Sequence, residues 1–113
     1  VVCLVGDGCF QMTVGELASA KRLGLTLPVV VLDDRWLSLI RIKQAHAQYG
    51  LYGSALQAEA YTEPPLHYFG VPAVGVRDGA ALASALEAAL AADGPTVIEA
   101  VVDPSHYMET VFD

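Results

Sequence analysis

The sequence predicts an α/β fold of three layers, with helices on both faces of a mostly parallel β-sheet. Apolar β-branched runs of strand length alternate regularly with segments of helical period, and turn residues separate them. Right-handed crossovers between such units give a sheet of at least four strands. Residues 1–113 are expected to form a single domain. Because the chain opens in mid-strand at Val1 without an initiator Met, we expect a partial domain, truncated on its N-terminal side, from a larger protein.

Each element of this fold has its own local signal. Buried strands are expected at residues 1–5, 28–32, 73–76 and 96–102, where apolar runs are bounded by turn residues. Helices are expected at residues 13–23, 36–48, 64–69 and 79–93. Residues 49–63 have no clear period and are expected to form a loop, and no structure is predicted for residues 103–113.

Capping signals and apolar faces refine these helices. Thr13 and Glu16 have the spacing of a capping box at the start of the first helix. Asp78 is the predicted N-cap of the last helix. In the second helix, one side is expected to carry Leu37, Ile40 and Gln44. The last helix is expected to bury a face made of Leu82, Ala85, Leu86, Ala89 and Leu90.

Charge and hydropathy exclude several classes of partner. The net charge is −7 and the chain has only six Lys and Arg residues, so neither nucleic acid nor an anionic membrane is an expected partner. No apolar run approaches the length of a membrane span and no export signal is present, so we expect a cytoplasmic location. A mean hydropathy of +0.44 is high for a free-standing domain, and part of the apolar surface is therefore expected to contact other protein.

The motif Gly6-Asp7-Gly8 stands at the carboxyl end of the first predicted strand, the edge at which open α/β sheets bind ligands. Glycines let the backbone approach a phosphate, whereas a carboxylate repels one. Asp7 between two glycines therefore indicates a hard cation that bridges it to phosphate oxygens. Asp34 follows the second strand and is expected at the same edge. Together the two carboxylates predict a magnesium and diphosphate site.

The segment from Gly6 to Asp34 resembles the thiamine-diphosphate motif, which opens with GDG and closes with a pair of Asn, or Asn and Asp. The similarity is to the acetolactate synthase-like branch of the thiamine-diphosphate-dependent enzymes, strongest over residues 1–44 and weaker from residue 61. It implies the C-terminal thiamine-diphosphate-binding domain, with that family's α/β/α fold. It also implies thiamine diphosphate and Mg²⁺ as cofactors, and leaves a requirement for FAD open.

The resemblance also implies a set of site residues. Asp7 and Asp34 would bind Mg²⁺, and the main-chain oxygen of Trp36 would complete the protein ligands. The cofactor would be bound by Gly6, Asp7, Gly8, Cys9 and Phe10, the last three through backbone N–H groups near the start of a helix. The chain departs from the commonest pattern by carrying Asp33-Asp34 where two Asn are usual, which changes the charge beside the diphosphate.

By the same resemblance, the complete multidomain enzyme would decarboxylate a small 2-oxo acid and transfer the remaining fragment to an acceptor. The cofactor supplies the chemistry. The family's activating glutamate comes from another domain, usually of a partner subunit, so no catalytic residue is assigned to this chain and the fragment alone is expected to be inactive. A homo-oligomer is expected. The sequence does not give the number of subunits, the 2-oxo acid or the acceptor.

Other functions stay open at this point. The nearest alternative is a 2-oxo acid decarboxylase of the benzoylformate or indolepyruvate type. A non-catalytic interaction module that retains the fold is another, with Asp33 as its only sequence hint. A different magnesium- and nucleotide-binding domain lacks support because the sequence has no P-loop and no GxGxxG pattern.

The remaining chemistry-bearing side chains have structural interpretations. Glu16 is expected to cap a helix rather than to act as an acid. No carboxylate or thiol partner at a telling spacing accompanies His46, His67 or His106. Cys3 and Cys9 are expected to be free thiols.

Overall fold

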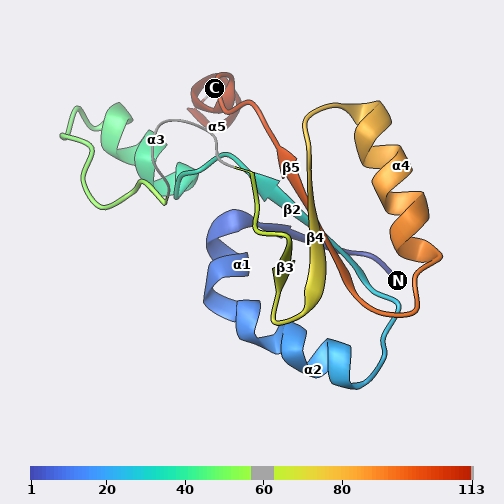
Figure 1. Cartoon of the computed structure of the whole chain (residues 1–113). Helices are drawn as coiled ribbons and strands as arrows, with labels where there is room; N and C mark the ends of the chain where they lie inside the picture. Colours follow the sequence, from blue (N-terminus) through green and yellow to red (C-terminus); the bar gives the residue numbers. More distant parts are fainter. Residues whose placement is uncertain (57–62, 113) are drawn as a thin grey trace.

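The computed structural model describes residues 1–56 and 63–112 and confirms the α/β class (Figure 1). The elements in chain order are β1 (Cys3–Gly6), α1 (Asp7–Thr13), the 3-10 helix η1 (Val14–Glu16), α2 (Leu17–Arg22), β2 (Pro28–Asp33), α3 (Ser38–His46), β3 (His67–Tyr68), β4 (Val71–Val76), α4 (Gly79–Leu90), β5 (Thr96–Val101) and α5 (Tyr107–Phe112). The two free cysteines are confirmed.

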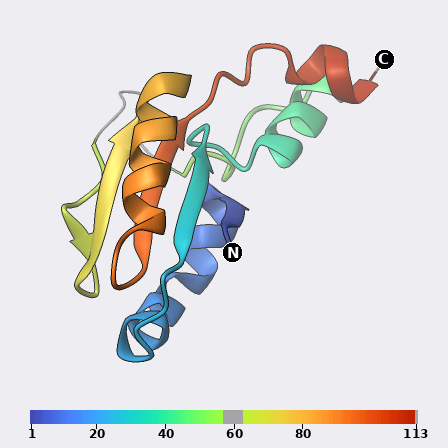
Figure 2. The ribbon, with the colours of Figure 1, turned by 90° about the vertical axis from the view of Figure 1, so that its right-hand side faces the viewer.

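One five-stranded sheet of order β1-β2-β5-β4-β3 forms the middle layer. All neighbouring strands pair in parallel except β3, which is antiparallel to β4. Gly6 pairs with Leu32, and Val31 pairs with Glu99, so the carboxyl ends of β1, β2 and β5 meet at one edge. Figure 2 shows α4 on one face of the sheet and α1 with α2 on the other.

Two apolar cores lie on opposite faces of the sheet because strand side chains alternate. On the α1 and α2 face the core consists of Phe10, Leu17, Val29, Val31, Val71 and Val97. On the α4 face it consists of Val30, Val76, Ala89, Ile98 and Ala100. The strands β2 and β5 contribute to both cores and lie next to each other in the sheet.

The prediction that residues 1–5 form a buried strand was wrong about burial. In the described part of the chain β1 is an end strand with one neighbour, and its side chains alternate between half-buried and exposed. Cys3 and Val5 pack against the core, whereas Leu4 is 67% exposed. An end strand with one covered face has this pattern.

The first helix begins earlier than predicted, at Asp7, and the predicted capping box was wrong. Thr13 is the last residue of α1, and its hydroxyl donates to the carbonyl of Cys9 one turn earlier, 3.0 Å away. Its side chain makes no cap hydrogen bond to η1, and Glu16 is exposed. A Thr inside a helical run commonly bonds its own helix in this way.

The predicted helix over residues 64–69 was also wrong, because a β-hairpin lies there. Tyr68 pairs with Val71 in the antiparallel β3–β4 ladder. The two turn residues both have positive φ, 52° at Phe69 and 79° at Gly70, which is the pattern of a two-residue type I′ turn. Phe-Gly is an unusual sequence for this turn, so its local signal was weak.

The helices α3 and α4 form near the predicted positions with altered faces. In α3 the buried residue is Ile42, while Ile40 is exposed. In α4 the Asp78 cap is confirmed, since its Oδ1 accepts from the Ala81 N–H at 2.8 Å. Leu90 is exposed at the end of α4 and does not join the predicted face.

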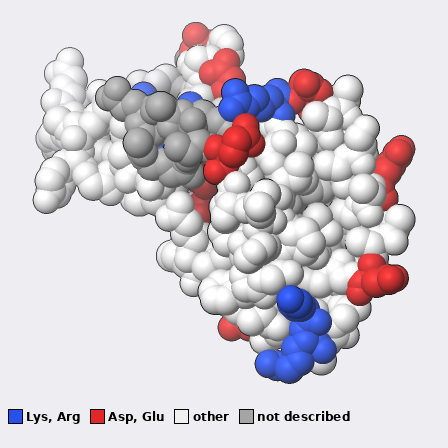
Figure 3. All heavy atoms as spheres, in the orientation of Figure 1, with Lys and Arg blue, Asp and Glu red and all other residues white. Residues whose placement is uncertain are grey.

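The last helix, α5, had no sequence prediction and lies beside α3 (Figures 1 and 2). His46 at the end of α3 stacks on Phe112, with ring centroids 4.0 Å apart. Charged side chains are sparse on the face drawn in Figure 3, where a basic group lies over the end of α2 that carries Lys21 and Arg22. None of the helices in the described ranges is long and apolar enough to cross a membrane.

Candidate functional site

Asp7 lies at the carboxyl edge of the sheet, where β1 turns directly into α1, and its side chain is buried. Its Oδ1 accepts from the Gly8 N–H at 2.8 Å, and its Oδ2 accepts from the Arg35 N–H at 2.9 Å. Burial raises the pKa of Asp7 to about 6, assisted by a hydrogen bond with Asp33 and by the charge of Asp34. The two predicted carboxylates are therefore close enough to repel each other.

Asp34 is half-buried and fixed by its own turn. Its Oδ1 accepts from the Trp36 N–H at 3.0 Å, and its Oδ2 accepts from the Ser38 hydroxyl at 2.5 Å. Burial raises the pKa of Tyr107 in α5, followed by the charge of Asp34 and a hydrogen bond with it. The C-terminal helix, for which no structure was predicted, thus reaches Asp34.

Trp36 is oriented by several contacts around its backbone and ring. It forms an isolated antiparallel bridge with Ala55, and the Arg41 guanidinium lies over its ring at 4.1 Å from the centroid. This cation–π contact fixes the half-buried Arg41 side chain against the indole ring. The main-chain oxygen of Trp36 stays a proposed ligand.

Residues Gly8, Cys9 and Phe10 form the first turn of α1, where backbone N–H groups have no intrahelical acceptor. The Gly8 N–H is engaged by Asp7. Gly8 also has a packing reason to be glycine, because a Cβ there would lie 2.9 Å from Leu37 Cδ2. Their contact with a diphosphate stays a proposal.

Sequence reasoning gave no role to the backbone of Arg35, which connects Asp7 with Asp33. Its N–H lies 2.9 Å from Asp7 Oδ2 and 2.9 Å from Asp33 Oδ1. Arg35 has a φ of 68°, in the left-handed region that a non-glycine residue adopts at an energetic cost. Asp33 is 1% exposed, and its Oδ2 receives no hydrogen bond from a donor within the described ranges.

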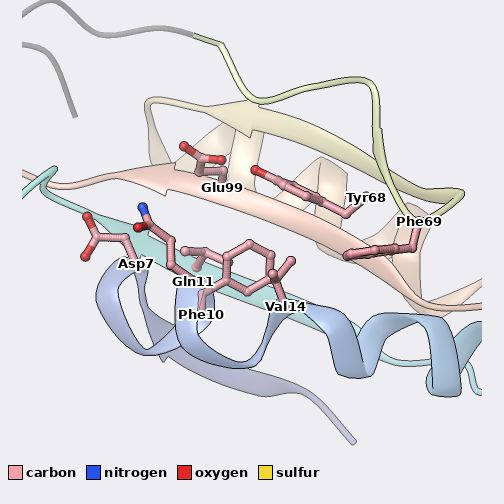
Figure 4. Close-up of a pocket in the computed structure, with 8 residues that line it drawn as sticks. Asp7, Phe10, Gln11, Val14, Tyr68, Phe69 and Glu99 are labelled. Carbon is pink, nitrogen blue, oxygen red and sulfur yellow. The ribbon is translucent and has the colours of Figure 1, made fainter. Parts of the chain in front are cut away.

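Glu99 is the second residue that sequence reasoning missed. It is a lone carboxyl in an apolar strand run, a signal that could have marked it. It lines a cavity of about 300 Å³ with Asp7, Phe10, Gln11, Val14, Val31, Tyr68 and Phe69. Figure 4 shows the Tyr68 hydroxyl pointing toward the Glu99 carboxyl, with Asp7 at the same end of the cavity. Burial, then the charge of Glu99, raises the pKa of Tyr68 to about 12.

The donor set fits a hard divalent cation. Asp7 and Asp34 supply carboxylate oxygens from neighbouring strand ends, and the described residues hold no cluster of three or more His, Cys, Asp or Glu side chains suited to a metal. A cation here would therefore also need main-chain and cofactor oxygens, which is how Mg²⁺ is usually bound beside phosphates. A cation bound between them would offset the charge of Asp34, which helps to raise the pKa of Asp7.

Comparison with known families decides which proteins share this arrangement. Residues 1–100 match the family model of the thiamine pyrophosphate enzyme C-terminal TPP binding domain. The chain belongs to this family. The acetolactate synthase large subunit of Pyropia yezoensis is 26% identical over 108 residues, covering 90% of this chain and 18% of the relative. The isozyme 2 large subunit of Escherichia coli K12 is 30% identical over 108 residues, covering 91% of this chain and 19% of the relative.

Solved enzyme structures share the fold of this chain. The thiamine pyrophosphate of the family's description is another name for thiamine diphosphate. A thiamine diphosphate-dependent 4-hydroxybenzoylformate decarboxylase from Rhodococcus jostii superposes with a TM-score of 0.76 at 25% identity, covering 93% of this chain and 20% of that one. Benzoylformate decarboxylase from Polynucleobacter necessarius superposes with a TM-score of 0.74 at 23% identity, over 90% and 19%. The resemblance to the acetolactate synthase-like branch is confirmed, and the chain spans about a fifth of its relatives.

Proposed function

We propose that this chain binds thiamine diphosphate through Mg²⁺ within an acetolactate synthase-like enzyme that acts on 2-oxo acids. Asp7, Asp34 and the main-chain oxygen of Trp36 would hold the metal. The first turn of α1, from Gly8 to Phe10, would contact the diphosphate. Residues 1–113 would be part of the cofactor-binding domain of a larger, homo-oligomeric enzyme.

One observation carries the metal proposal. The adjacent parallel strands β1 and β2 end beside each other, and the carboxylates that follow them act on each other electrostatically. Folding two like charges together is unfavourable unless a proton or a cation compensates them. An all-oxygen donor set next to helix N–H groups supports Mg²⁺ with a phosphate group as that compensation.

When bound, thiamine diphosphate supplies the carbon–carbon bond chemistry, and this chain's part is to anchor it. The curated relatives are named acetolactate synthases, which supports decarboxylation with carboligation as the reaction. The solved decarboxylases support the alternative of decarboxylation alone.

Calorimetric titration of thiamine diphosphate into the intact protein, with and without Mg²⁺, tests the anchor. Wild type should bind only with Mg²⁺, and Asp34→Ala should lose most of this binding because it removes a ligand oxygen. Asp34→Asn keeps one ligand oxygen and an acceptor for the Trp36 N–H, so it should retain binding. Asp93→Ala removes an exposed carboxylate before β5, at the opposite edge of the sheet, and is the matched control.

Magnesium-independent binding in the wild type would overturn the proposed metal bridge. Equal binding by wild type and Asp34→Ala would remove Asp34 from the ligand set. Thermal melts of each variant exclude unfolding as the cause of a lost signal. If the folded intact protein does not bind at all, the interaction-module alternative replaces the enzyme proposal.

The reaction is tested by supplying pyruvate or benzoylformate to the loaded intact enzyme. Carboligation joins two pyruvate molecules into acetolactate and releases one carbon dioxide. Decarboxylation alone releases carbon dioxide and leaves an aldehyde. Acetolactate from pyruvate would support the leading proposal, whereas benzaldehyde from benzoylformate with no ligation product would favour the alternative.

A further inference from the structure

Glu99 occupies an unusual place for an acidic side chain. It lies in the middle of β5, between β2 and β4, where it pairs with Val31 on one side and Gly75 on the other. Its side chain is 6% exposed and shares the α1 face of the sheet with Val97. An isolated charge in such surroundings is costly, so Glu99 needs hydrogen-bonding partners or a proton.

Asp33 and Tyr68 are its polar neighbours. Asp33 stands two residues after Val31 on the adjacent strand and so lies on the same face, and the Tyr68 hydroxyl points toward the Glu99 carboxyl (Figure 4). Burial, then the hydrogen bond with Asp33, raises the pKa of Glu99 to about 8. Since two ionised carboxylates cannot hydrogen bond to each other, one of the pair must carry a proton. The raised pKa of Glu99 supports Glu99 as the member of the pair that carries this proton.

The carboxylate of Asp33 can accept a hydrogen bond from this proton. Its Oδ2 is buried and takes no hydrogen bond from an N–H or hydroxyl group among residues 1–56 and 63–112. Asp7 is the other neighbouring carboxyl group, but both of its oxygens already accept backbone N–H groups, from Gly8 and Arg35, so Glu99 is the carboxyl group left to donate. Donation from Glu99 would satisfy the buried oxygen, which otherwise carries the full cost of desolvation.

Asp33 in turn is connected to the proposed metal ligand. Its Oδ1 shares the Arg35 N–H with Asp7 Oδ2, each at 2.9 Å. Arg35 holds a left-handed φ of 68°, a conformation that persists only where the surroundings fix it. A displacement of Asp33 would release this peptide and with it one of the two hydrogen bonds that orient Asp7.

We propose that Glu99 is a positioning residue for the metal site, acting as a hydrogen-bond donor to Asp33 and through the Arg35 peptide on Asp7. This inference rests on the proposed function, because it takes Asp7 as a Mg²⁺ ligand. Groups that orient ligating carboxylates control metal affinity without touching the metal.

The alternative is that Glu99 only fills space, and two substitutions of similar length separate the roles. Glu99→Gln retains a donor, through its side-chain amide. Glu99→Met has no donor, and it replaces a buried acid by an apolar group, which is often neutral or favourable for stability. A space-filling role predicts that both variants bind metal equally.

The experiment measures Mg²⁺ affinity of the intact protein at saturating thiamine diphosphate, together with the thermal midpoint. We expect Glu99→Gln to bind Mg²⁺ nearly as well as wild type, and Glu99→Met to fold but to bind about 10- to 100-fold more weakly. Wild-type affinity in Glu99→Met would overturn the inference. Equal weakening in Glu99→Gln would also overturn it, since the donor would then not be the cause.

A second measurement does not depend on the Met variant folding. The infrared spectrum of the wild type at neutral pH should contain the carbonyl stretch of a neutral carboxylic acid, and Glu99→Gln should lose it. Absence of that band in the wild type contradicts the donor role. If the wild type shows no Mg²⁺-dependent cofactor binding, the proposed function itself fails. If the wild type binds as proposed, the comparison of Glu99→Gln with Glu99→Met tests the role of Glu99 alone.

Discussion

At the scale of single residues, the carboxyl groups of Asp7, Asp34 and Glu99 lie at or directly after three neighbouring strands of the sheet, β1, β2 and β5. Asp7 was predicted because glycines flank it at a strand end, and Asp34 because it follows the next strand. Glu99 is distant from both in sequence and joins them through the β2–β5 pairing. A lone carboxyl in an apolar strand run marks Glu99 as unusual, but only the pairing of β5 with β2 shows that it lies behind Asp7, and such long-range pairing cannot be read from a local pattern.

The raised pKa values predict how stability depends on pH in the metal-free protein. The pKa of Glu99 is raised from 4.5 to about 8 and that of Asp7 from 3.8 to about 6, so the folded state holds these protons more tightly. Their stabilising contribution is complete below the unfolded values and is lost as pH rises through the folded values. The urea concentration at the unfolding midpoint should therefore decrease as the pH is raised from about 5 to about 8, because these two groups lose their protons in the folded state over this range.

Glu99→Gln removes one of these titrations, so its urea midpoint should change less over the upper part of this range. Glu87→Gln, an exposed glutamate of α4, is the matched control and should follow the wild type. A wild-type midpoint that rises steadily from acid to neutral pH would contradict the assigned direction.

At the scale of elements, predictions held where the deciding signal was local and failed where tertiary contacts decided. The strand at residues 28–32 and the Asp78 cap were predicted correctly because a buried run and a cap residue suffice. The β3–β4 hairpin was missed because Pro64 and Pro65 suited a helix start and Phe-Gly is an unusual I′ turn. The core fixes this hairpin through Tyr68, whose ring contacts Phe10 edge to face at 5.2 Å.

The hairpin turn provides a test of this interpretation. Gly70 has a φ of 79°, and a Cβ there would lie 2.0 Å from Lys21 Nζ. The flexible lysine can move, but the left-handed backbone remains unfavourable, so Gly70→Ala should lower the free energy of unfolding by about 1–2 kcal/mol. Gly15→Ala, at a position with no positive φ and no atom within 4 Å, should not destabilise. Equal denaturant midpoints for wild type and Gly70→Ala would disprove the strained turn.

At the scale of the whole molecule, the sheet supports a site at one edge by burying a core on each face. The high hydropathy predicted apolar surface, and large apolar side chains are indeed exposed on β1, on the loop after α3 and at the helix ends. The chain covers only about a fifth of its relatives, so the proposed partners of this surface are other parts of the complete enzyme.

The two-core arrangement predicts different costs for buried and exposed truncations. Ile98 is fully buried in β5 on the α4 face, so Ile98→Ala should lower the free energy of unfolding by about 2–5 kcal/mol. Leu4→Ala, on the exposed face of β1, should change it by less than about 1 kcal/mol, because little apolar area leaves the protein interior. Similar losses in the two variants, measured by urea unfolding, would contradict the burial of β5.

The most direct test of the proposed cofactor anchor is a diffraction experiment on the intact protein with thiamine diphosphate and Mn²⁺ in place of Mg²⁺. Anomalous scattering then locates the metal without reference to the assigned ligands. We predict a single peak bound by the carboxylates of Asp7 and Asp34 and the main-chain oxygen of Trp36, with the diphosphate against the first turn of α1. A peak elsewhere, or a diphosphate bound away from Asp7 without metal, would contradict the account.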